Sequence, residues 1–528
     1  MNKLAVYLNK QISGNVFDKK SILEAYSTDR SALKIVPKFV AFPEKTEDVQ
    51  KILSFFNQLA IKNFKLPIGI WGSGLDTTGA DLTSGLLIST ERMNEIKEID
   101  PHDRLVHVES GVTLGQLNSA LSTHGLILPI NADPRETIGG LISNCPTDSY
   151  AAHFGGIMNY IERAEIVLSD GSIIQTSSMN KNSLSKRKSQ DNLEGSIYRE
   201  IETLLKENPA LMGKFSETQN LAGYPSIFRC QEDQKTFDIL PMFYGAQGTL
   251  GVITEIILHV EPLPKYPKHL VLSFGSFKSA EECMQFLKPL NPLELAFYDS
   301  TIFNIAEKSG KKPTIFSKKL PDEGYTVHAV FNANRNSKKK IEECLNTLPK
   351  NAAIFISNPH ESTEFHELTN SLLSYLNTDS DKEYTPIIND IFIPLSELGN
   401  FIHNLKFLEE KHRTKFNIYG SYATNIYSIR PEINITTDEG RLFVIELLRD
   451  FNTLLNIHHG HLAGGTPEGR LKALLTNHEH TGEEKRIFKT IKSIFDPNHI
   501  LSPDIKLDAD PRTTSHHFRS SINQNIQF

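Results

Sequence analysis

The most constraining feature of the sequence is a glycine-rich loop that follows a short apolar strand. The apolar run at residues 66–70 (L-P-I-G-I) predicts a buried strand, and it leads into W-G-S-G-L-D-T-T-G-A-D at residues 71–81. Glycines let backbone N–H groups turn toward an anion without a Cβ in the way. Successive inward N–H groups form a nest that can hold a pyrophosphate. No Lys-Ser/Thr pair follows Gly79, so this is neither a Walker loop nor the Rossmann fingerprint. Alone, the loop is at least as compatible with a turn that binds nothing.

Three more glycine segments lie among predicted short strands. They are Thr137-Ile138-Gly139-Gly140, Gly155-Gly156 and G-T-L-G-V-I at residues 248–253. Each places glycines beside β-branched residues, as needed where a backbone packs against a flat ring and donates hydrogen bonds to it. Turns and β-bulges explain the same pattern. The residues by themselves leave the two interpretations open.

Composition narrows the class of protein. A chain of 528 residues with 39% hydrophobic content can bury a large core in two or three domains. The net charge of −7 argues against nucleic acid as a partner. The four cysteines form no Cys-x-x-Cys pair, which removes support for zinc ribbons and iron–sulfur motifs. No apolar window reaches the roughly 18 residues of a membrane helix, and the start lacks a secretory signal. We therefore expect a cytoplasmic protein, for which peripheral contact with a membrane stays open.

Local signals predict several elements. Residues 45–61 place their apolar side chains on one helical face, with Thr46 as the expected N-cap. Thr113 and Gln116 form a capping box for a second helix, which Gly125 is placed to end. The remaining assignments are a hairpin at Asp170-Gly171, an exposed loop at 178–195, strands at 249–260 and a helix at 484–496.

The order of these segments resembles the vanillyl-alcohol oxidase / p-cresol methylhydroxylase superfamily of FAD proteins. Within it, the chain looks most like the FAD-linked D-lactate, glycolate and D-2-hydroxyglutarate dehydrogenase branch. The segments that carry the resemblance run through most of the chain: Y-S-T-D (26–29) with V-P-K-F-V-A-F-P (36–43), W-G-S-G-L-D-T-T-G-A (71–80), T-I-G-G-L-I-S-N (137–144), F-G-G-I-M-N-Y-I (154–161), N-L-A-G-Y (220–224), Y-G-A-Q-G-T-L-G-V-I-T-E (244–255) and I-F-D-P-N-H-I-L-S-P (494–503).

The resemblance implies an α+β fold: a two-lobed FAD-binding domain of the PCMH type plus a cap with an antiparallel sheet. The FAD-binding domain would cover residues 1–265, with its core at about 35–265. The cap would cover 266–415, and residues 416–506 would close back on the FAD domain. The polar tail at 507–528 is expected to be disordered.

The resemblance also assigns cofactor-binding positions, residue by residue. Gly72, Ser73, Gly74, Leu75 and Asp76 would cradle the pyrophosphate of FAD. The positions that would line the rest of the cofactor are Thr137, Gly139, Gly140, Gly155, Ile157, Gly251 and Ile253. Some relatives attach FAD to a histidine in the first loop, and Leu75 stands at that position here. We therefore predict non-covalent FAD.

The chain departs from this branch at the metal site. The branch usually shows Gly-His-x-Gly-Asp-Gly-Asn-x-His, and its two histidine positions are Ser421 and Ser428 here. A later Gly-Glu-His-Gly element has Gly465 at the glutamate and Thr466 at the histidine. Serine hydroxyls are poor zinc ligands. We therefore predict no metal, and metal-assisted oxidation cannot be carried over.

Other side chains are candidates for the missing chemistry. His459 and His461 precede the G-G-T-P-E-G-R segment at 464–470, and a histidine suits proton transfer near neutral pH. Tyr422 is a candidate phenol, and Arg430 and Arg470 are candidate anion partners. Each has a plain structural alternative: a polar strand end for the histidines, core packing for the tyrosine, and bonds to carbonyls or FAD phosphate for the arginines.

The leading functional hypothesis is an FAD-dependent dehydrogenase that acts on a CH–OH group of a small hydroxy substrate. Hydride would pass to the flavin, a side chain would take the hydroxyl proton, and electrons would leave to a quinone, a cytochrome or a protein. One alternative is an oxygen-using oxidase on a sugar or an aromatic alcohol. Another is a flavin-binding subunit that has lost its own chemistry.

Overall fold

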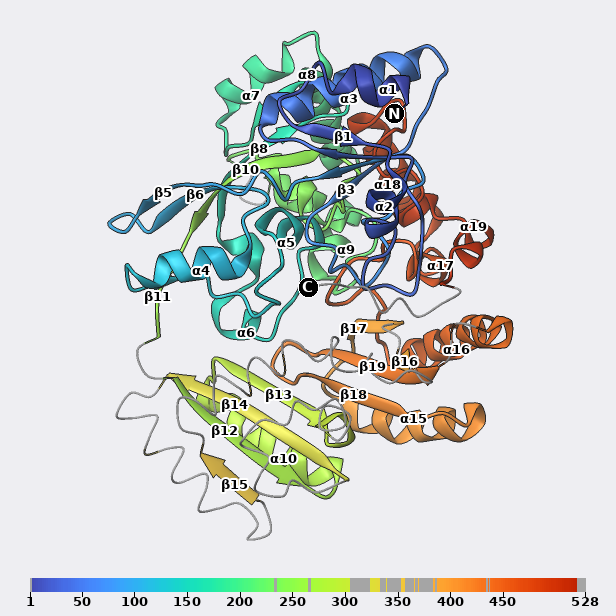
Figure 1. The fold of residues 1–528 in the computed structure, drawn as a ribbon. Helices are drawn as coiled ribbons and strands as arrows, with labels where there is room; N and C mark the ends of the chain where they lie inside the picture. Colours follow the sequence, from blue (N-terminus) through green and yellow to red (C-terminus); the bar gives the residue numbers. More distant parts are fainter. Residues whose placement is uncertain are drawn as a thin grey trace.

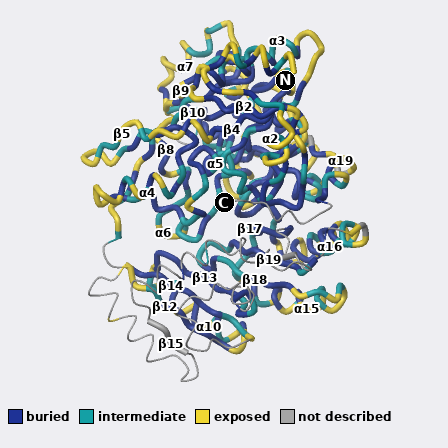
Figure 2. The backbone as a smooth tube through the Cα atoms, in the orientation of Figure 1, coloured by how far each residue is buried: buried dark blue, intermediate teal, exposed yellow. Residues whose placement is uncertain are grey.

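The structure is a computed structural model of the chain. It describes residues 2–231, 235–264, 267–303, 323–332, 339, 353–356, 365, 369, 383–384, 387–433, 435 and 437–519. Two bodies are visible in Figure 1: an N-terminal body with two sheets, and a cap built on one large sheet. Buried residues fill the middle of both bodies in Figure 2.

The first sheet of the N-terminal body has the order β1-β2-β4-β3. Its strands are β1 (Asn15–Phe17), β2 (Phe39–Phe42), β3 (Ile68–Trp71) and β4 (Leu86–Ser89). β2, β3 and β4 are parallel, so a crossover must join β2 to β3, and α3 (Thr46–Ile61) supplies it. The apolar face of α3 is buried as its periodicity predicts. The short helices α1 (Lys3–Leu8) and α2 (Lys20–Ala25) precede this unit.

The second sheet is antiparallel, with the order β5-β6-β10-β8-β9. Its strands are β5 (Ile96–Asp100), β6 (Leu105–Glu109), β8 (Ile161–Val167), β9 (Ile173–Gln175) and β10 (Val252–His259), and β7 (Leu126–Ile127) pairs with β11 (Glu261–Pro262). Its helical segments are α4 (Leu114–Ser122), α5 (Ile138–Asn144), α6 (Ala151–Phe154), η1 (Ile157–Asn159), α7 (Lys181–Lys188), α8 (Leu193–Glu207), α9 (Pro209–Glu217), η2 (Pro225–Gln231) and η3 (Leu240–Phe243). The predicted capping box of α4 is present, and the Asp170-Gly171 turn joins β8 to β9 with Gly171 at φ +88°.

The cap is an antiparallel sheet with the order β15-β12-β14-β13-β18-β19-β16, and β17 also pairs with β19. Its strands are β12 (Pro267–Phe274), β13 (Glu294–Asp299), β14 (Tyr325–Asn332), β15 (Ala353–Ile356), β16 (Glu383–Tyr384), β17 (Ile388–Phe392), β18 (Phe416–Ser421) and β19 (Ile426–Ile433). The helical segments of the cap are α10 (Phe277–Leu287), η4 (Lys288–Leu290), α15 (Leu398–His412) and α16 (Asp438–Ile457). Since β18 and β19 belong to this sheet, the cap continues beyond the boundary expected at residue 415.

The chain then returns to the N-terminal body through α17 (Ala473–Thr476), α18 (Gly482–Phe495), η6 (Lys506–Asp508) and α19 (Pro511–His516). α18 contributes Phe488 and Phe495 to the core that packs around the second sheet. Leu501 then forms a parallel β-bridge with Ile68, the first residue of β3. The return therefore ties the end of the chain to the strand that carries the glycine loop.

Three local expectations need correction. Thr46 does not cap α3: it is the first helical residue, and its hydroxyl bonds Glu165 instead. Residues 181–188, expected as loop, form α7 because Asn180 caps them and Leu184 is buried. The tail is ordered as far as Arg519, whose buried guanidinium donates to the carbonyl of Asp29. Residues 520–528 lie outside the described residues.

Within the described residues, we find no helix with the length and apolar character needed to span a bilayer.

Candidate functional site

Three of the four glycine segments converge on one narrow cavity in the N-terminal body. Its lining includes Gly72, Ser110, Gly139, Gly140, Asn144, Gln247, Gly248, Gly251 and Ile253. Neighbouring atoms lie too close to these glycines to leave room for a side chain. A Cβ on Gly72 would lie 2.5 Å from Thr137 Oγ1, and one on Gly251 would lie 2.8 Å from Ile166 Cγ2. We call this cavity the glycine cradle.

The first glycine loop presents open backbone donors. The Asp76 carboxylate accepts hydrogen bonds from the N–H groups of Thr78 (2.9 Å) and Ala80 (2.8 Å), which folds the loop back on itself. The N–H groups of residues 73–77 find no acceptor among the described residues. Gly74 has φ +68°, a conformation that glycine adopts without strain. Backbone N–H groups without an acceptor can form the nest that a pyrophosphate needs.

An acidic side chain in the glycine cradle is compatible with an anionic ligand. Asp81 lines the cavity. Burial, together with the nearby Asp76 and Asp29 carboxylates, holds the pKa of Asp81 well above its usual value. A neutral carboxyl can donate a hydrogen bond where a carboxylate would repel phosphate.

The structure brings together most of the predicted cofactor positions. Thr137 caps α5 by accepting from the N–H of Gly140 at 3.2 Å, and its hydroxyl lies close to Gly72 of the loop. Gly155 and Ile157 line neither the glycine cradle nor the chamber described next: Gly155 has φ +82° beside Asn159, and Ile157 is core.

A larger cavity of about 250 Å³, here called the chamber, lies between the N-terminal body and the cap. Asn144 lines both cavities, so they adjoin. The N-terminal body contributes Arg30, Leu75, Asp76, Asn131, Asp133, Glu136 and Asp148 to its wall, the cap contributes Asn389, Asp390, Tyr419, Ser428 and Arg430, and the return segment contributes Thr466.

Arg430 is the most unusual group in the chamber wall. It is 1% exposed, and it donates to two neutral partners, the Asn389 amide and the Tyr419 hydroxyl (2.7 Å). Its Nε has no hydrogen-bond partner among the described residues. A buried guanidinium is costly unless it is paired. The guanidinium of Arg430 can therefore bind an anionic group of a ligand.

Asp390 lines the same cavity and is held in place by two hydroxyl groups. Ser428 Oγ lies 3.3 Å from Asp390 Oδ1, and Thr466 Oγ1 donates to Oδ2 at 3.1 Å. Asp390 lies in the irregular register of β17 against β19 and has φ +51°. Such bulges and strained residues often serve to aim a side chain at a functional site.

A buried lysine stands behind this carboxylate. Lys472 Nζ donates to Thr466 Oγ1 at 2.9 Å, and Thr466 in turn donates to Asp390. Burial lowers the pKa of Lys472 to about 8. Ser428 and Thr466 occupy positions where the resemblance expects metal-binding histidines. The described residues contain no group of three or more His, Cys, Asp or Glu side chains able to hold a metal. A hydrogen-bonded Asp–Thr–Lys chain stands there instead.

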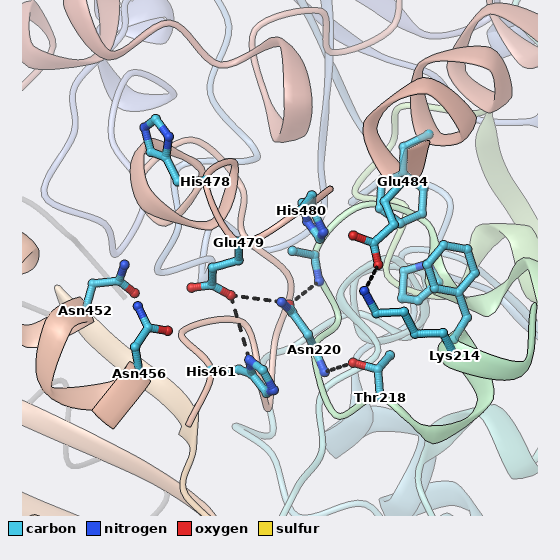
Figure 3. Close-up of a pocket in the computed structure, with 14 residues that line it drawn as sticks. Lys214, Thr218, Asn220, Asn452, Asn456, His461, His478, Glu479, His480 and Glu484 are labelled. Carbon is cyan, nitrogen blue, oxygen red and sulfur yellow. Dashed lines mark hydrogen bonds and ion pairs between the residues drawn. The ribbon is translucent and has the colours of Figure 1, made fainter. Parts of the chain in front are cut away.

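None of the three predicted catalytic side chains lines the chamber. Tyr422 is fully buried in the cap core, with its ring beside Lys288, and burial raises its pKa to about 12. His459 is exposed at the end of α16. His461 lines a different cavity, shown in Figure 3. Arg470 bonds the carbonyls of Leu82 and Asp504.

Sequence reasoning missed Asp390 altogether. The only local signal is that Asn389-Asp390 interrupts the apolar run I-I-x-x-I-F-I at 387–393. A polar pair inside a buried strand is unusual enough to deserve a functional explanation.

Two buried carboxyls meet where the cap touches the N-terminal body. Glu294 is 2% exposed on β13 and accepts from Ser149 Oγ at 3.0 Å, and Asp148 is 8% exposed beside it. Burial raises the pKa of each to about 7, and for Glu294 the Asp148 charge adds to the rise. Both therefore bind protons more tightly in the folded protein than in the unfolded chain.

The sign of the resulting pH dependence follows from linkage. Because the folded pKa exceeds the unfolded value, the stability contribution of Glu294 is present at low pH and is lost as pH rises from about 4.5 to about 7. Glu294→Gln removes this loss. At pH 8 we expect the substitution to raise the free energy of unfolding by about 1–3 kcal/mol and so to raise the thermal midpoint. At pH 5 we expect it to change both little. Thermal melts at both pH values measure the difference, and an equal effect at the two would contradict this account.

Comparisons with known proteins agree with this geometry. Residues 37–177 match the FAD binding domain family, and residues 263–505 match the C-terminal domain of FAD linked oxidases. The chain is 23% identical to D-2-hydroxyglutarate dehydrogenase of Pseudomonas putida, over 94% of this chain and 50% of the relative. It is 26% identical to D-lactate dehydrogenase [cytochrome] 1 of Saccharomyces cerevisiae, over 97% of this chain and 81% of the relative.

The chain thus spans about half the length of the D-2-hydroxyglutarate dehydrogenases it matches. Among solved structures, p-cresol methylhydroxylase has the same fold, with a TM-score of 0.66 at 14% identity over 94% of this chain and 95% of that one. The predicted α+β architecture and the FAD cofactor are confirmed. The chain therefore contains the FAD binding domain and, after it, the C-terminal domain of FAD linked oxidases, and it has the fold of p-cresol methylhydroxylase.

Proposed function

We propose that the protein is an FAD-dependent dehydrogenase that oxidises the CH–OH group of a small hydroxy acid in the chamber. The observation that carries the proposal is Arg430, a buried guanidinium with neutral partners and an open Nε on the chamber wall. A carboxylate is the ordinary partner of such a group. The names of the relatives, D-2-hydroxyglutarate and D-lactate dehydrogenases, support the same substrate class.

Two charged groups of the chamber wall have separate roles in the proposed reaction. Arg430 binds the substrate carboxylate and fixes its orientation. Asp390 accepts the hydroxyl proton, and the hydroxyls of Ser428 and Thr466 hold its carboxylate in place. Bound FAD supplies the two-electron acceptor for the hydride that leaves the substrate carbon.

Lys472 acts on this reaction through Thr466. Below pH 8 its ammonium is charged, because its pKa lies near 8. It donates to Thr466, which donates to Asp390, so the positive charge stabilises the carboxylate without touching the substrate.

Anaerobic titration tests the proposal. Purified protein with its flavin should bleach when a D-2-hydroxy acid is added without any metal, and the methyl ester of the same acid should bleach it far more slowly. Equal rates for acid and ester would count against carboxylate recognition. Failure of every hydroxy acid, sugar and aromatic alcohol to bleach the flavin would favour the flavin-binding subunit.

The electron acceptor also belongs to the proposal. We propose a quinone or a cytochrome, and the relative named as a cytochrome-linked D-lactate dehydrogenase supports the second. Rapid peroxide release in air would favour the oxidase alternative instead. The cytoplasmic location stays a prediction.

Non-covalent attachment of the flavin is a separate prediction. Leu75 on the chamber wall has no nucleophilic atom, and the nearby Cys145 thiol is kept protonated because burial raises its pKa to about 12. We expect acid precipitation to leave all of the flavin absorbance in the supernatant. Yellow colour in the washed pellet would show a covalent link elsewhere.

A further inference from the structure

A second cavity, of about 410 Å³, lies outside the chamber and shares none of its lining residues. Its size is within the usual range for small-molecule pockets. Three parts of the chain meet there: α9 with the loop after it, the end of α16 with the turn after it, and α18 with the loop before it. Figure 3 shows the polar side chains that point into it.

One end of this cavity holds a carboxylate with an open oxygen. Glu479 Oε2 accepts from Asn220 Nδ2 at 2.9 Å and lies 3.8 Å from His461 Nδ1. Glu479 Oε1 is buried and has no hydrogen-bond partner among the described residues, and the same is true of Asn452 Oδ1. In Figure 3 these two side chains point toward one another across the cavity. Two buried acceptors without a donor are costly in the empty protein.

The charges around this end favour a cation. Lys214 lies 2.7 Å from Glu484, so its charge is already matched. Burial lowers the pKa of His480, which keeps that ring neutral at physiological pH. Apart from the histidines, Glu479 therefore has no unmatched cationic side chain beside it in the cavity lining. A metal ion is a poor occupant, because no group of three or more His, Cys, Asp or Glu ligands is found in the described part of the chain.

The other end of the cavity is apolar and aromatic. The rings of Phe215 and Phe488 stack with centroids 5.3 Å apart, and Ala222 and Pro225 complete this wall. Such a surface binds the hydrocarbon or ring portion of a ligand.

We propose that this cavity is a second small-molecule site, which binds an organic primary ammonium ion that carries an apolar or aromatic group. An ammonium has three donors and no acceptor, which matches the open oxygens of Glu479 and Asn452 and the negative charge beside them. The apolar part packs on Phe215 and Phe488. This inference does not depend on the reaction in the chamber.

Isothermal titration of the full-length, FAD-loaded chain with 2-phenylethylammonium chloride tests the proposal. We expect saturable binding at one site, and no binding of the neutral 2-phenylethanol or of 3-phenylpropionate at the same concentrations. Glu479→Gln keeps the acceptor of Asn220 but removes the charge, and it should weaken binding at least tenfold. Asn452→Asp adds a second carboxylate and should tighten binding.

The control is Glu483→Gln, because Glu483 is an exposed acid of α18 that does not line the cavity. It should bind like the unmodified chain. Thermal melts of all variants show whether the fold is kept. The proposal is overturned if the ammonium does not bind, if the acid binds as well as the ammonium, or if a folded Glu479→Gln variant binds it unchanged. If the Asn452→Asp variant binds the ammonium with unchanged affinity, Asn452 does not contact the ligand.

Discussion

Replacing Arg430 by methionine should lower kcat/KM for hydroxy-acid oxidation by about a thousandfold while FAD remains bound. A buried charge-assisted hydrogen bond contributes about 1.5–3 kcal/mol, and an unpaired buried charge costs more. Loss of about 4 kcal/mol corresponds to the expected factor. Most of it should appear in KM, because Arg430 binds the carboxylate in the ground state as well as in the transition state. Steady-state assays, with the 450 nm absorbance as a measure of bound flavin, provide the test.

Comparing the loss of activity for the hydroxy acid and for its methyl ester separates lost carboxylate recognition from a general disturbance of the chamber wall. The preference for a hydroxy acid over its methyl ester should disappear in the Arg430→Met variant, because the ester never used the guanidinium. Arg449→Met is the matched control, since Arg449 is an exposed arginine of α16 away from the chamber. Equal losses for acid and ester would mean that Arg430 only supports the wall through Asn389 and Tyr419.

The glycine cradle could be predicted from sequence because its information is local. At Gly72, Gly139 and Gly251 a Cβ would collide with atoms of a neighbouring segment. That requirement leaves glycines at fixed spacings within short runs, a pattern that is recognisable in the sequence. The capping box of α4 could be predicted for the same reason.

The chamber could not be predicted in this way because its groups come from separate strands. Asp390 and Ser428 are 38 residues apart and meet only because β17 pairs with β19. Tyr419 and Tyr422 are close in sequence, yet Tyr419 lines the chamber and Tyr422 packs in the core. Nearness to a family motif also misplaced His461: its backbone pairs with Phe392, and its side chain lines the second cavity.

Asp390→Asn should slow flavin reduction by about 10²–10⁴-fold, the usual contribution of a general base. The amide is the same size as the carboxylate; its oxygen can accept from Thr466 and its NH2 can donate to Ser428 Oγ, so the wall should keep its shape. Asparagine cannot take the substrate proton, and the hydride cannot leave until that proton has somewhere to go. Substrate binding should change little, because Arg430 is untouched. Stopped-flow mixing of anaerobic enzyme with substrate measures the reduction rate and the apparent Kd separately.

The matched control for this variant is Asp299→Asn, a partly buried carboxyl at the end of β13 that bonds Thr301 outside the chamber. It should reduce at the rate of the unmodified protein. A slow Asp390→Asn variant with unchanged Kd would assign the proton to Asp390. If flavin reduction in the Asp390→Asn variant is as fast as in the unmodified protein, another carboxyl of the chamber must be the base. Glu136 is the first to test, since burial raises its pKa to about 7.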